Sequence, residues 1–365
     1  MFQTRRIIPT NTQIGRLILL GRFDEELVHK FDPAYWYPAV AGQVLNDRYK
    51  LLAKLGFGSS STVWLAKDVT RWSWLPTRYV TLKISTSHFS KSPITDLHKH
   101  ESHISRQILA KNSSHPGLQF LRTPIDTFEV QGQKGAHLVL AYEPMREPLS
   151  MLLNRFKEAG NDKQCEPEFV KTVIGKTLPG GYTVHMSHED LGPIMPDKHI
   201  GPLKIHDFGS AVELGGNSNP LSTPASYAAP EVLLGCEDGT GSDVWDVGMI
   251  VWELLAGKPL FEGADPEFKI RTIRKHLADL TSLLGPPPHS LLSRGKSSLS
   301  YFTSGGKFKY PNLLTHHRKL RAKFMGKMSH DEQDAFLDFM KGVVVWDPLE
   351  RKSVKELMGH RWLSQ

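Results

Sequence analysis

The chain has 365 residues, a formal net charge of +7 and a hydrophobic fraction of 39%. This length suffices for one large core or two lobes, and the composition is that of an ordinary globular protein. No stretch approaches the ~18 apolar residues that a membrane-crossing helix needs, so we expect no membrane span. The only two cysteines, Cys165 and Cys236, lack metal-binding spacing and are too few for a disulfide scaffold, which favours a reducing compartment, the cytoplasm or the nucleus.

The positive charge favours anionic partners without distinguishing ATP from nucleic acid or a membrane surface. Because no Lys/Arg run with interleaved aromatic residues stands out, we do not expect a nucleic-acid partner. Residues 1–45 have weak periodicity and are interpreted as an N-terminal extension. The first 23 residues carry four arginines and no acidic residue, a pattern found in mitochondrial presequences and in disordered basic tails, and we favour the tail.

Five short runs rich in β-branched and aromatic residues predict strands in the first half of the chain. They cover residues 48–56, 61–68, 78–85, 125–130 and 137–144. Residues 96–110, between the third and fourth runs, predict a single helix. Residues 46–145 are therefore expected to form a small sheet-based lobe.

The second half, residues 146–365, has a helical pattern. Residues 242–257 are apolar on nearly all faces, which predicts a buried helix that ends at Gly257. Further helices are expected over 265–285, 331–344 and 353–363. The Pro286–Pro288 run and the Ser/Gly-rich stretch 293–306 predict loops.

The stretch LGFGSSSTVWLA, residues 55–66, predicts a glycine-rich turn between two strands. Gly56 and Gly58 would let the backbone approach a triphosphate and turn tightly. Glycines also make plain hairpins, so this motif is weak evidence until others accompany it.

Lys83 stands late in a predicted buried strand, where an unpaired ammonium group would be costly. Glu101, on the predicted helix, is the only glutamate between Lys83 and Glu129. A phosphate and a carboxylate are natural partners for such a lysine. The alternative is a solvated lysine and a surface glutamate, but the order and spacing favour the functional interpretation.

Asp207-Phe208-Gly209 supplies a hard oxygen ligand that suits Mg²⁺. It precedes Ala229-Pro230-Glu231, which the predicted buried helix with Asp243 follows. Arg351 is expected to pair with Glu231, because a buried carboxylate needs such a partner. We expect a structural role for Glu231, Asp243 and Arg351.

With these motifs in this order, the chain resembles eukaryotic serine/threonine protein kinases. More narrowly, it resembles the SR-protein kinase family in its fungal relatives. The narrower resemblance rests on FDPAYWYPAVAGQVLNDRYKLLAKLGFGSSSTVWLAKD (31–68), PEVLLG (230–235) and HLADLTSLLGPPPHSLLSRGKSSLSYF (276–302). It implies an α+β, two-lobed kinase fold with a small antiparallel β-sheet lobe that carries one helix, and a larger helical lobe.

The resemblance also implies ATP and Mg²⁺ as cofactors and a protein substrate, Arg/Ser-rich in the SR-protein kinase family. Lys83 would hold the α- and β-phosphates, Glu101 would orient Lys83, and Asp207 would bind Mg²⁺. Tyr142 would guard the back of the pocket, and Thr81, where the family usually has alanine, would narrow the adenine site. The implied ATP-binding residues are Leu55, Gly56, Phe57, Gly58, Ser59, Ser60, Ser61, Thr62, Val63, Lys83, Glu143 and Met145.

One family element is not found. The family takes its catalytic base and a second metal ligand from one loop, His-Arg-Asp or His-Thr-Asp with an asparagine five residues after the aspartate. Asp190, in His188-Glu189-Asp190, is the only local candidate for the base and lies 17 residues before Asp207. Met195 stands where the asparagine should be, and a methionine does not bind Mg²⁺.

Pro179-Gly180-Gly181 would break the helix that should support such a loop. The surrounding segment also resembles the family's stretch between the catalytic loop and Asp-Phe-Gly. We therefore favour a helical lobe that is truncated around residues 154–166, with Asp190 as a lookalike of the base. Three hypotheses stay open: an active kinase, a catalytically dead pseudokinase that binds ATP or a partner, and an incomplete gene model.

Overall fold

The computed structural model divides the chain into two compact units. The first comprises Met1–Gln107, Thr123–Met145 and Ser187–Glu189, and the second comprises Ile108–Arg122, Arg146–Met186 and Asp190–Gln365. The structure describes residues 32–58, 60–87, 93–111, 114, 116–145, 165, 167–168, 170–171, 204–211, 227–236, 239–261, 264–315, 320 and 328–364. Each unit is described by itself.

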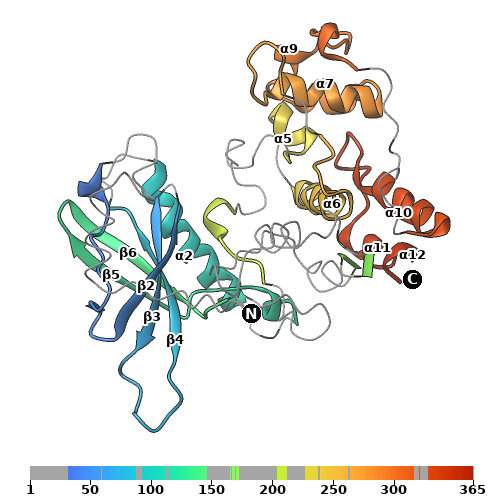
Figure 1. Ribbon diagram of the computed structural model, residues 1–365. Helices are drawn as coiled ribbons and strands as arrows, with labels where there is room; N and C mark the ends of the chain where they lie inside the picture. The colour runs from blue at the N-terminus through green and yellow to red at the C-terminus, as the bar shows by residue number, and fades with distance from the viewer. Residues whose placement is uncertain are drawn as a thin grey trace, which may run out of the picture. The chain divides into compact units, whose positions relative to one another are not determined.

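The first unit contains a six-stranded antiparallel sheet with the order β1-β2-β3-β4-β6-β5 (Figure 1). The strands are β1 (Val44–Leu45), β2 (Tyr49–Phe57), β3 (Ser61–Asp68), β4 (Tyr79–Ser85), β5 (Asp126–Gly132) and β6 (Gly135–Tyr142). All five predicted strands are confirmed to within about two residues at each end. Sequence reasoning missed β1, because two residues are too few for an alternating pattern to be visible.

One face of this sheet is the apolar core of the first unit. Alternate residues of the four neighbouring strands β2, β3, β4 and β6 point to it, and the apolar side chains of Tyr37 and Ala39 pack against it. The backbone of the same segment is also tied down, because Ser87 N–H donates a 2.7 Å hydrogen bond to the Tyr35 carbonyl. The short 3₁₀ turn η2 (Pro33–Tyr35) and β1 thus make residues 33–45 part of the lobe, although the sequence assigned them to the extension. The core residues are Leu45, Tyr49, Leu51, Trp64, Ala66, Val80, Leu82, Ile84, Val139 and Ala141.

Helix α2 (Pro93–Lys111) is the single helix expected between the third and fourth predicted strands. It starts three residues earlier than predicted and ends one residue later. The 3₁₀ turn η3 (Pro116–Phe120) follows it, and Leu121 then forms an isolated parallel bridge with Ile205. None of the helices that the structure describes is long and apolar enough to cross a membrane.

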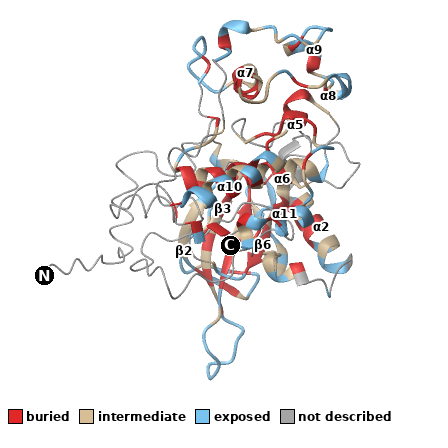
Figure 2. Ribbon diagram, turned by 90° about the vertical axis from the view of Figure 1, so that its right-hand side faces the viewer, coloured by how far each residue is buried: buried red, intermediate tan, exposed pale blue. Residues whose placement is uncertain are grey.

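The second unit is helical. Its described elements are η4 (Phe208–Ser210), α5 (Pro230–Leu234), α6 (Thr240–Ala256), α7 (Ile273–Leu284), α8 (His289–Arg294), α9 (Ser298–Tyr301), η5 (Pro311–Leu313), α10 (His330–Val343), α11 (Val354–Met358) and α12 (Arg361–Ser364). Helix α6 carries many buried residues, drawn red in Figure 2. It ends at Gly257 in the left-handed conformation, with φ of 67°, as predicted.

Helices α6 and α10 approach closely at Gly248. A Cβ atom at that position would lie 2.3 Å from Val343 Cγ1, so only glycine fits without a shift of one helix. Trp252 of α6 and Phe336 of α10 also belong to the apolar core of this unit, with ring centroids 6.1 Å apart. The predicted helices over 242–257 and 331–344 are therefore confirmed, and they pack on each other.

The prediction of one helix over 265–285 is wrong for its first eight residues. Asp265 is fully buried and accepts hydrogen bonds from Arg274 and Thr272. These bonds, that of Arg274 above all, hold the pKa of Asp265 well below its ordinary value. The Thr272 hydroxyl caps α7 by accepting from Lys275 N–H, so the helix begins only after Thr272.

Two smaller predictions also fail in the second unit. The C-terminal helix is broken into α11 and α12, and the break falls at Gly359 and His360. Helix α9 and the last two residues of α8 lie in the stretch 293–306, which was predicted as a loop. Both helices have six residues or fewer, which is too short for a periodic pattern to reveal them.

Candidate functional site

Lys83 and Glu101 form an ion pair in the first unit. Lys83 Nζ lies 2.7 Å from Glu101 Oε2, and the two side chains are 18% and 2% exposed. Lys83 comes from β4 and Glu101 from α2, so the pair joins the helix to the sheet. The predicted partnership of these residues is confirmed as a contact.

The strand register explains why Lys83 faces α2. In an antiparallel sheet, directly opposite residues point to the same face and neighbours along a strand point to opposite faces. Lys83 lies opposite Val63 of β3 and Leu140 of β6, and Thr81 lies opposite Tyr142. These five side chains therefore share the sheet face opposite the apolar core.

Tyr142 has a polar contact that the sequence did not reveal. Its hydroxyl donates a 2.6 Å hydrogen bond to Glu101 Oε1, and the residue is 5% exposed. The sequence assigned Tyr142 only a steric role at the back of a pocket. A resemblance gives the position of a side chain along the chain, but which atom it meets depends on strand register and on the rotation of α2.

The glycine-rich turn joins β2 to β3, as predicted. Neither Gly56 nor Gly58 has a positive φ, so the turn does not require glycine for its backbone conformation. A Cβ atom at Gly56 would meet no other atom within 4 Å. Open space beside the backbone is what the close approach of a phosphate group needs.

The other predicted ATP-binding residues near this turn are described except Ser59. Leu55 and Val63 are half-buried and Ser61 and Thr62 are buried, whereas Phe57 and Gly58 are exposed. Thr86 N–H donates a hydrogen bond to the Ser60 carbonyl at 2.9 Å, which ties the turn to the end of β4.

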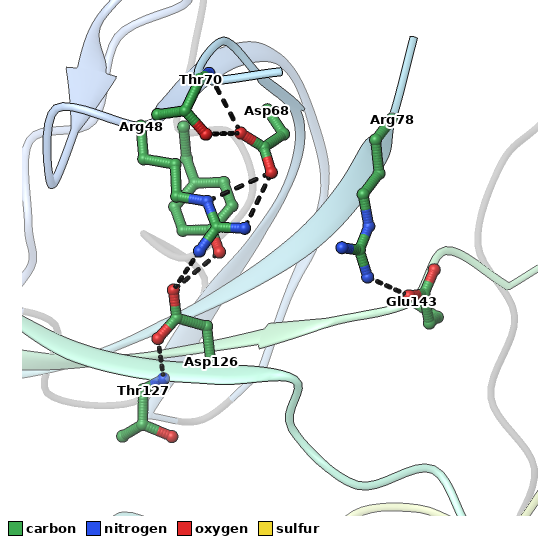
Figure 3. A network of polar contacts seen from close by, with 8 residues as sticks. Arg48, Asp68, Thr70, Arg78, Asp126, Thr127 and Glu143 are labelled. Atoms are coloured by element: carbon green, nitrogen blue, oxygen red, sulfur yellow. Dashed lines mark hydrogen bonds and ion pairs between the residues drawn. The ribbon is translucent and has the colours of Figure 1, made fainter. Parts of the chain in front are cut away.

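Glu143 and Met145 follow directly after β6, where the family resemblance places backbone groups for adenine. The Glu143 carboxylate pairs with Arg78 at the start of β4 (Figure 3). Met145 is half-buried. Both residues thus lie at the end of the strand that carries Tyr142.

A second polar network in Figure 3 fixes the same sheet. Arg48 pairs with Asp68 at 2.9 Å and with Asp126 at 3.2 Å. Tyr49 also donates a hydrogen bond to Asp126 at 2.7 Å, and burial together with this bond raises the pKa of Tyr49. The network ties β2, β3 and β5 together and supports the site only through the rigidity of the sheet.

Asp207 belongs to the second unit and is exposed at the start of η4. Its backbone is left-handed, with φ of 67° and ψ of 62°. Aspartate tolerates this conformation better than most residues, and such conformations are enriched at functional sites. The isolated parallel bridge from Leu121 to Ile205 anchors the segment before Asp207, and Phe208 after it is buried.

The described residues contain no group of three or more metal-ligating side chains. Asp207 thus offers one carboxylate for Mg²⁺, and a complete magnesium site needs further ligands. The described residues fit ATP better than they fit Mg²⁺. The Lys83 ammonium is held in place by Glu101 and can pair with phosphates, and the glycine-rich turn leaves open space beside its backbone.

The Glu231–Arg351 pair is confirmed. Arg351 donates from both terminal nitrogens to the two carboxylate oxygens, at 2.7 Å and 3.0 Å. Each side chain is 1% exposed. This closed, bidentate geometry has no access for a ligand, in agreement with the structural role predicted for it.

Asp243, on α6, contrasts with Glu231. Burial raises the pKa of its carboxyl to about 6, and no described residue donates a hydrogen bond to that carboxylate. A carboxylate that is partly buried without donors is costly. The sequence predicted a structural role for Asp243, and the described residues do not include the group that it would hold.

Asp190, Met195 and the region 154–164 lie outside the described residues. Cys165 is described and buried, and its N–H donates a hydrogen bond to the Leu254 carbonyl. Val170 belongs to the same apolar core, and Lys171 pairs with Glu332 at 2.7 Å. The described residues from Cys165 to Lys171 are therefore packed on the helical unit.

The chain is similar in sequence to several known protein kinases. A serine/threonine protein kinase of Aspergillus fumigatus is 27% identical over 380 aligned positions, which cover 94% of this chain and 91% of the relative. Protein kinase MCK1 of Saccharomyces cerevisiae is 25% identical over 332 positions, covering 88% of this chain and 80% of the relative. Dual specificity tyrosine-phosphorylation-regulated kinase 3 of Rattus norvegicus is 29% identical over 250 positions, covering 63% and 41%.

The family model described as "Protein kinase domain" matches residues 49–363. This range includes the whole sheet from β2 onward, the Lys83–Glu101 pair, Asp207 and the Glu231–Arg351 pair. An antiparallel sheet lobe and a helical lobe are the α+β architecture expected from the sequence. The chain belongs to the protein kinase family.

Proposed function

We propose that this chain binds ATP through Lys83 and that its family activity is transfer of the γ-phosphate to serine or threonine hydroxyls of a protein. The observation that carries the proposal is the Lys83–Glu101 pair, whose cation is partly exposed while its carboxylate is buried. A lysine held in this way suits the α- and β-phosphates. Asp207 would hold the Mg²⁺ that offsets phosphate charge.

In this proposal the residues of the chain position the nucleotide. Glu101 keeps the Lys83 ammonium on one side of the sheet, and Leu55 and Val63 cover the adenine. Thr81, opposite Tyr142 in the sheet, narrows the adenine site by its hydroxyl. In kinase reactions of this family, most of the rate enhancement comes from such positioning and from charge stabilisation.

For the substrate, we propose an Arg/Ser-rich protein, as the resemblance to SR-protein kinases suggests. The support lies in the segments 31–68, 230–235 and 276–302, which carry that resemblance. Neither of the two cysteines forms a disulfide, and Cys165 is buried; this fits the proposed cytoplasmic or nuclear location.

The test is phosphate transfer from labelled ATP to an Arg-Ser repeat peptide, with a Lys-Ser repeat peptide of the same charge as control. Incorporation that depends on Lys83 and prefers the Arg-Ser peptide is expected. Equal labelling of both peptides would contradict the substrate class alone. No difference between the wild-type protein and Lys83→Met would contradict catalysis by this chain.

A second candidate function is a non-catalytic, nucleotide-binding member of the family that lacks the catalytic loop. Two sequence features support it: Met195 stands where the family's metal-binding asparagine should be, and Pro179-Gly180-Gly181 would break the helix that supports the catalytic loop. The partly buried Asp243 carboxylate, to which no described residue donates a hydrogen bond, agrees with it.

The two candidates differ in turnover. Loss of the catalytic base alone costs about 10²–10⁴-fold in rate, so the non-catalytic candidate predicts stabilisation by ATP without phosphate transfer. Sequencing of the transcript across codons 150–166 decides whether the loop is truly absent. A recovered His-x-Asp-x-x-x-x-Asn segment would contradict the non-catalytic candidate.

A further inference from the structure

The two oxygens of the buried Glu101 carboxylate are held by two different donors. Lys83 Nζ lies 2.7 Å from Oε2, and the Tyr142 hydroxyl donates to Oε1 at 2.6 Å. Glu101 is 2% exposed, so water contributes little to its solvation. Both contacts involve an ionised group and therefore belong to the stronger class of hydrogen bonds.

Of the two donors, Tyr142 is the rigid one. Its strand, β6, is hydrogen-bonded on both sides, to β4 and to β5. The residue is 5% exposed and its side chain has only two torsions that place the ring. Lys83, by contrast, carries its charge at the end of a flexible four-carbon chain.

The register places Tyr142 beside the ion pair. Thr81 lies opposite Tyr142, and Lys83 lies opposite Leu140. Tyr142 and Lys83 are therefore on the same sheet face, on neighbouring strands, and offset by two residues along the strands. Glu101 reaches this face from α2. The tyrosine thereby connects the helix to the sheet independently of the lysine.

We propose that Tyr142 is a positioning residue for nucleotide binding: its hydroxyl fixes the Glu101 carboxylate, which in turn orients the Lys83 ammonium toward the phosphates. This inference rests on the proposed ATP site and adds a residue to it. Without the hydroxyl, Glu101 Oε1 loses its donor in a buried site. The carboxylate is then free to rotate, and Lys83 loses its fixed direction.

Tyr142→Phe tests this, because it removes one oxygen atom and keeps the ring. Dissociation constants for ATP and for adenosine are measured by calorimetry on the full chain. We expect ATP to bind about tenfold more weakly to the variant, the loss of about one charge-assisted hydrogen bond, and adenosine to bind as before. If the hydroxyl had a purely structural role, its loss would weaken the binding of ATP and of adenosine equally, and that result would overturn the proposal.

Tyr49→Phe is the matched control. It also removes a tyrosine hydroxyl that donates to a carboxylate, that of Asp126, at 2.7 Å. Tyr49 lies in the same sheet, but its side chain belongs to the apolar core on the face opposite Tyr142. We expect Tyr49→Phe to leave the affinities for ATP and adenosine unchanged, and an equal loss of ATP affinity in both variants would overturn the proposal.

A double-mutant cycle tests the contact itself. Urea unfolding is compared for the wild-type protein, Tyr142→Phe, Glu101→Ala and the double variant. Tyr142→Phe is expected to shift the midpoint less when Glu101→Ala is already present, whereas additive shifts would show that the hydroxyl does not act through Glu101.

The two levels of the proposal fail in different ways. If the wild-type chain binds no ATP, the proposed nucleotide site is wrong and the positioning role falls with it. If the wild-type chain binds ATP and Tyr142→Phe binds it equally well, only the positioning role is wrong.

Discussion

Glu101 and Glu231 are two buried glutamates whose partner cations differ in exposure to solvent. Glu231 is closed off by Arg351 through a bidentate pair in which both side chains are 1% exposed. Glu101 shares its oxygens between a rigid tyrosine and a lysine that is 18% exposed. Both carboxylates are buried, and what differs is the exposure of the partner cation: the Glu231–Arg351 pair is sealed on both sides, whereas the Lys83 ammonium has a side on which an anion could meet it.

Arg351→Met would break the sealed pair and should have the largest effect. It leaves the Glu231 carboxylate buried without its partner, which costs about 3–5 kcal/mol in the free energy of unfolding. Urea unfolding measures the loss. Arg294→Met is the matched control, because Arg294 pairs with the buried Asp347 but is itself 39% exposed, and it should cost about 1 kcal/mol or less.

Lys83→Met would break the open pair. Its cost in the free energy of unfolding should be smaller, about 1–3 kcal/mol, because Glu101 keeps the hydrogen bond from Tyr142. ATP should no longer raise the unfolding temperature of Lys83→Met, whereas it should still raise that of Arg294→Met. An ATP-induced shift that survives in Lys83→Met would place the nucleotide elsewhere.

Asp243 sharpens the comparison, since burial raises the pKa of its carboxyl from 3.8 to about 6. The folded state thus binds this proton more tightly than the unfolded state. The favourable contribution is fully present below about pH 4 and is lost as the pH rises through about 6. Asp243→Asn should remove this part of the pH dependence and stabilise the chain by about 1–3 kcal/mol at pH 8.

Unfolding curves from pH 4 to pH 8 for both proteins check this. Parallel pH profiles of the wild-type protein and Asp243→Asn would show that the carboxylate has donors after all. Addition of the family's catalytic-loop segment to the chain should remove the benefit of the substitution, if that segment supplies those donors.

The exposed pair Arg78–Glu143 should have the smallest effect. Its side chains are 35% and 55% exposed, so solvent screens the interaction. Arg78→Ala is expected to change the free energy of unfolding by about 0.5 kcal/mol or less, measured by urea unfolding at low and high salt. A loss similar to that of Lys83→Met would contradict the use of cation exposure as the criterion.

Sequence reasoning succeeded where the signal is local or ordered along the chain. The strands around Thr62 and Lys83 show alternation or β-branched runs within a few residues, and the end of α6 is marked by Gly257. The pairing of Lys83 with Glu101, and of Arg351 with Glu231, followed from motif order together with the cost of burying an unpaired charge. It failed at the start of α7, where the local helical pattern was overruled by the hydrogen bonds of Asp265 to Arg274 and Thr272.

By itself, the sequence determined the family, the strands of the small lobe and the identity of the main charged residues, because these depend on short periodic patterns and on residue order. Beyond the Lys83–Glu101 and Glu231–Arg351 pairs, only the tertiary structure decided which contacts such residues make. The hydroxyl of Tyr142 meets Glu101 because the β4–β6 register and the rotation of α2 bring them to one sheet face. The pKa of Asp243 is raised because the packing of α6 removes part of its carboxyl from water. Both facts come from three-dimensional packing, in which residues distant along the chain become neighbours.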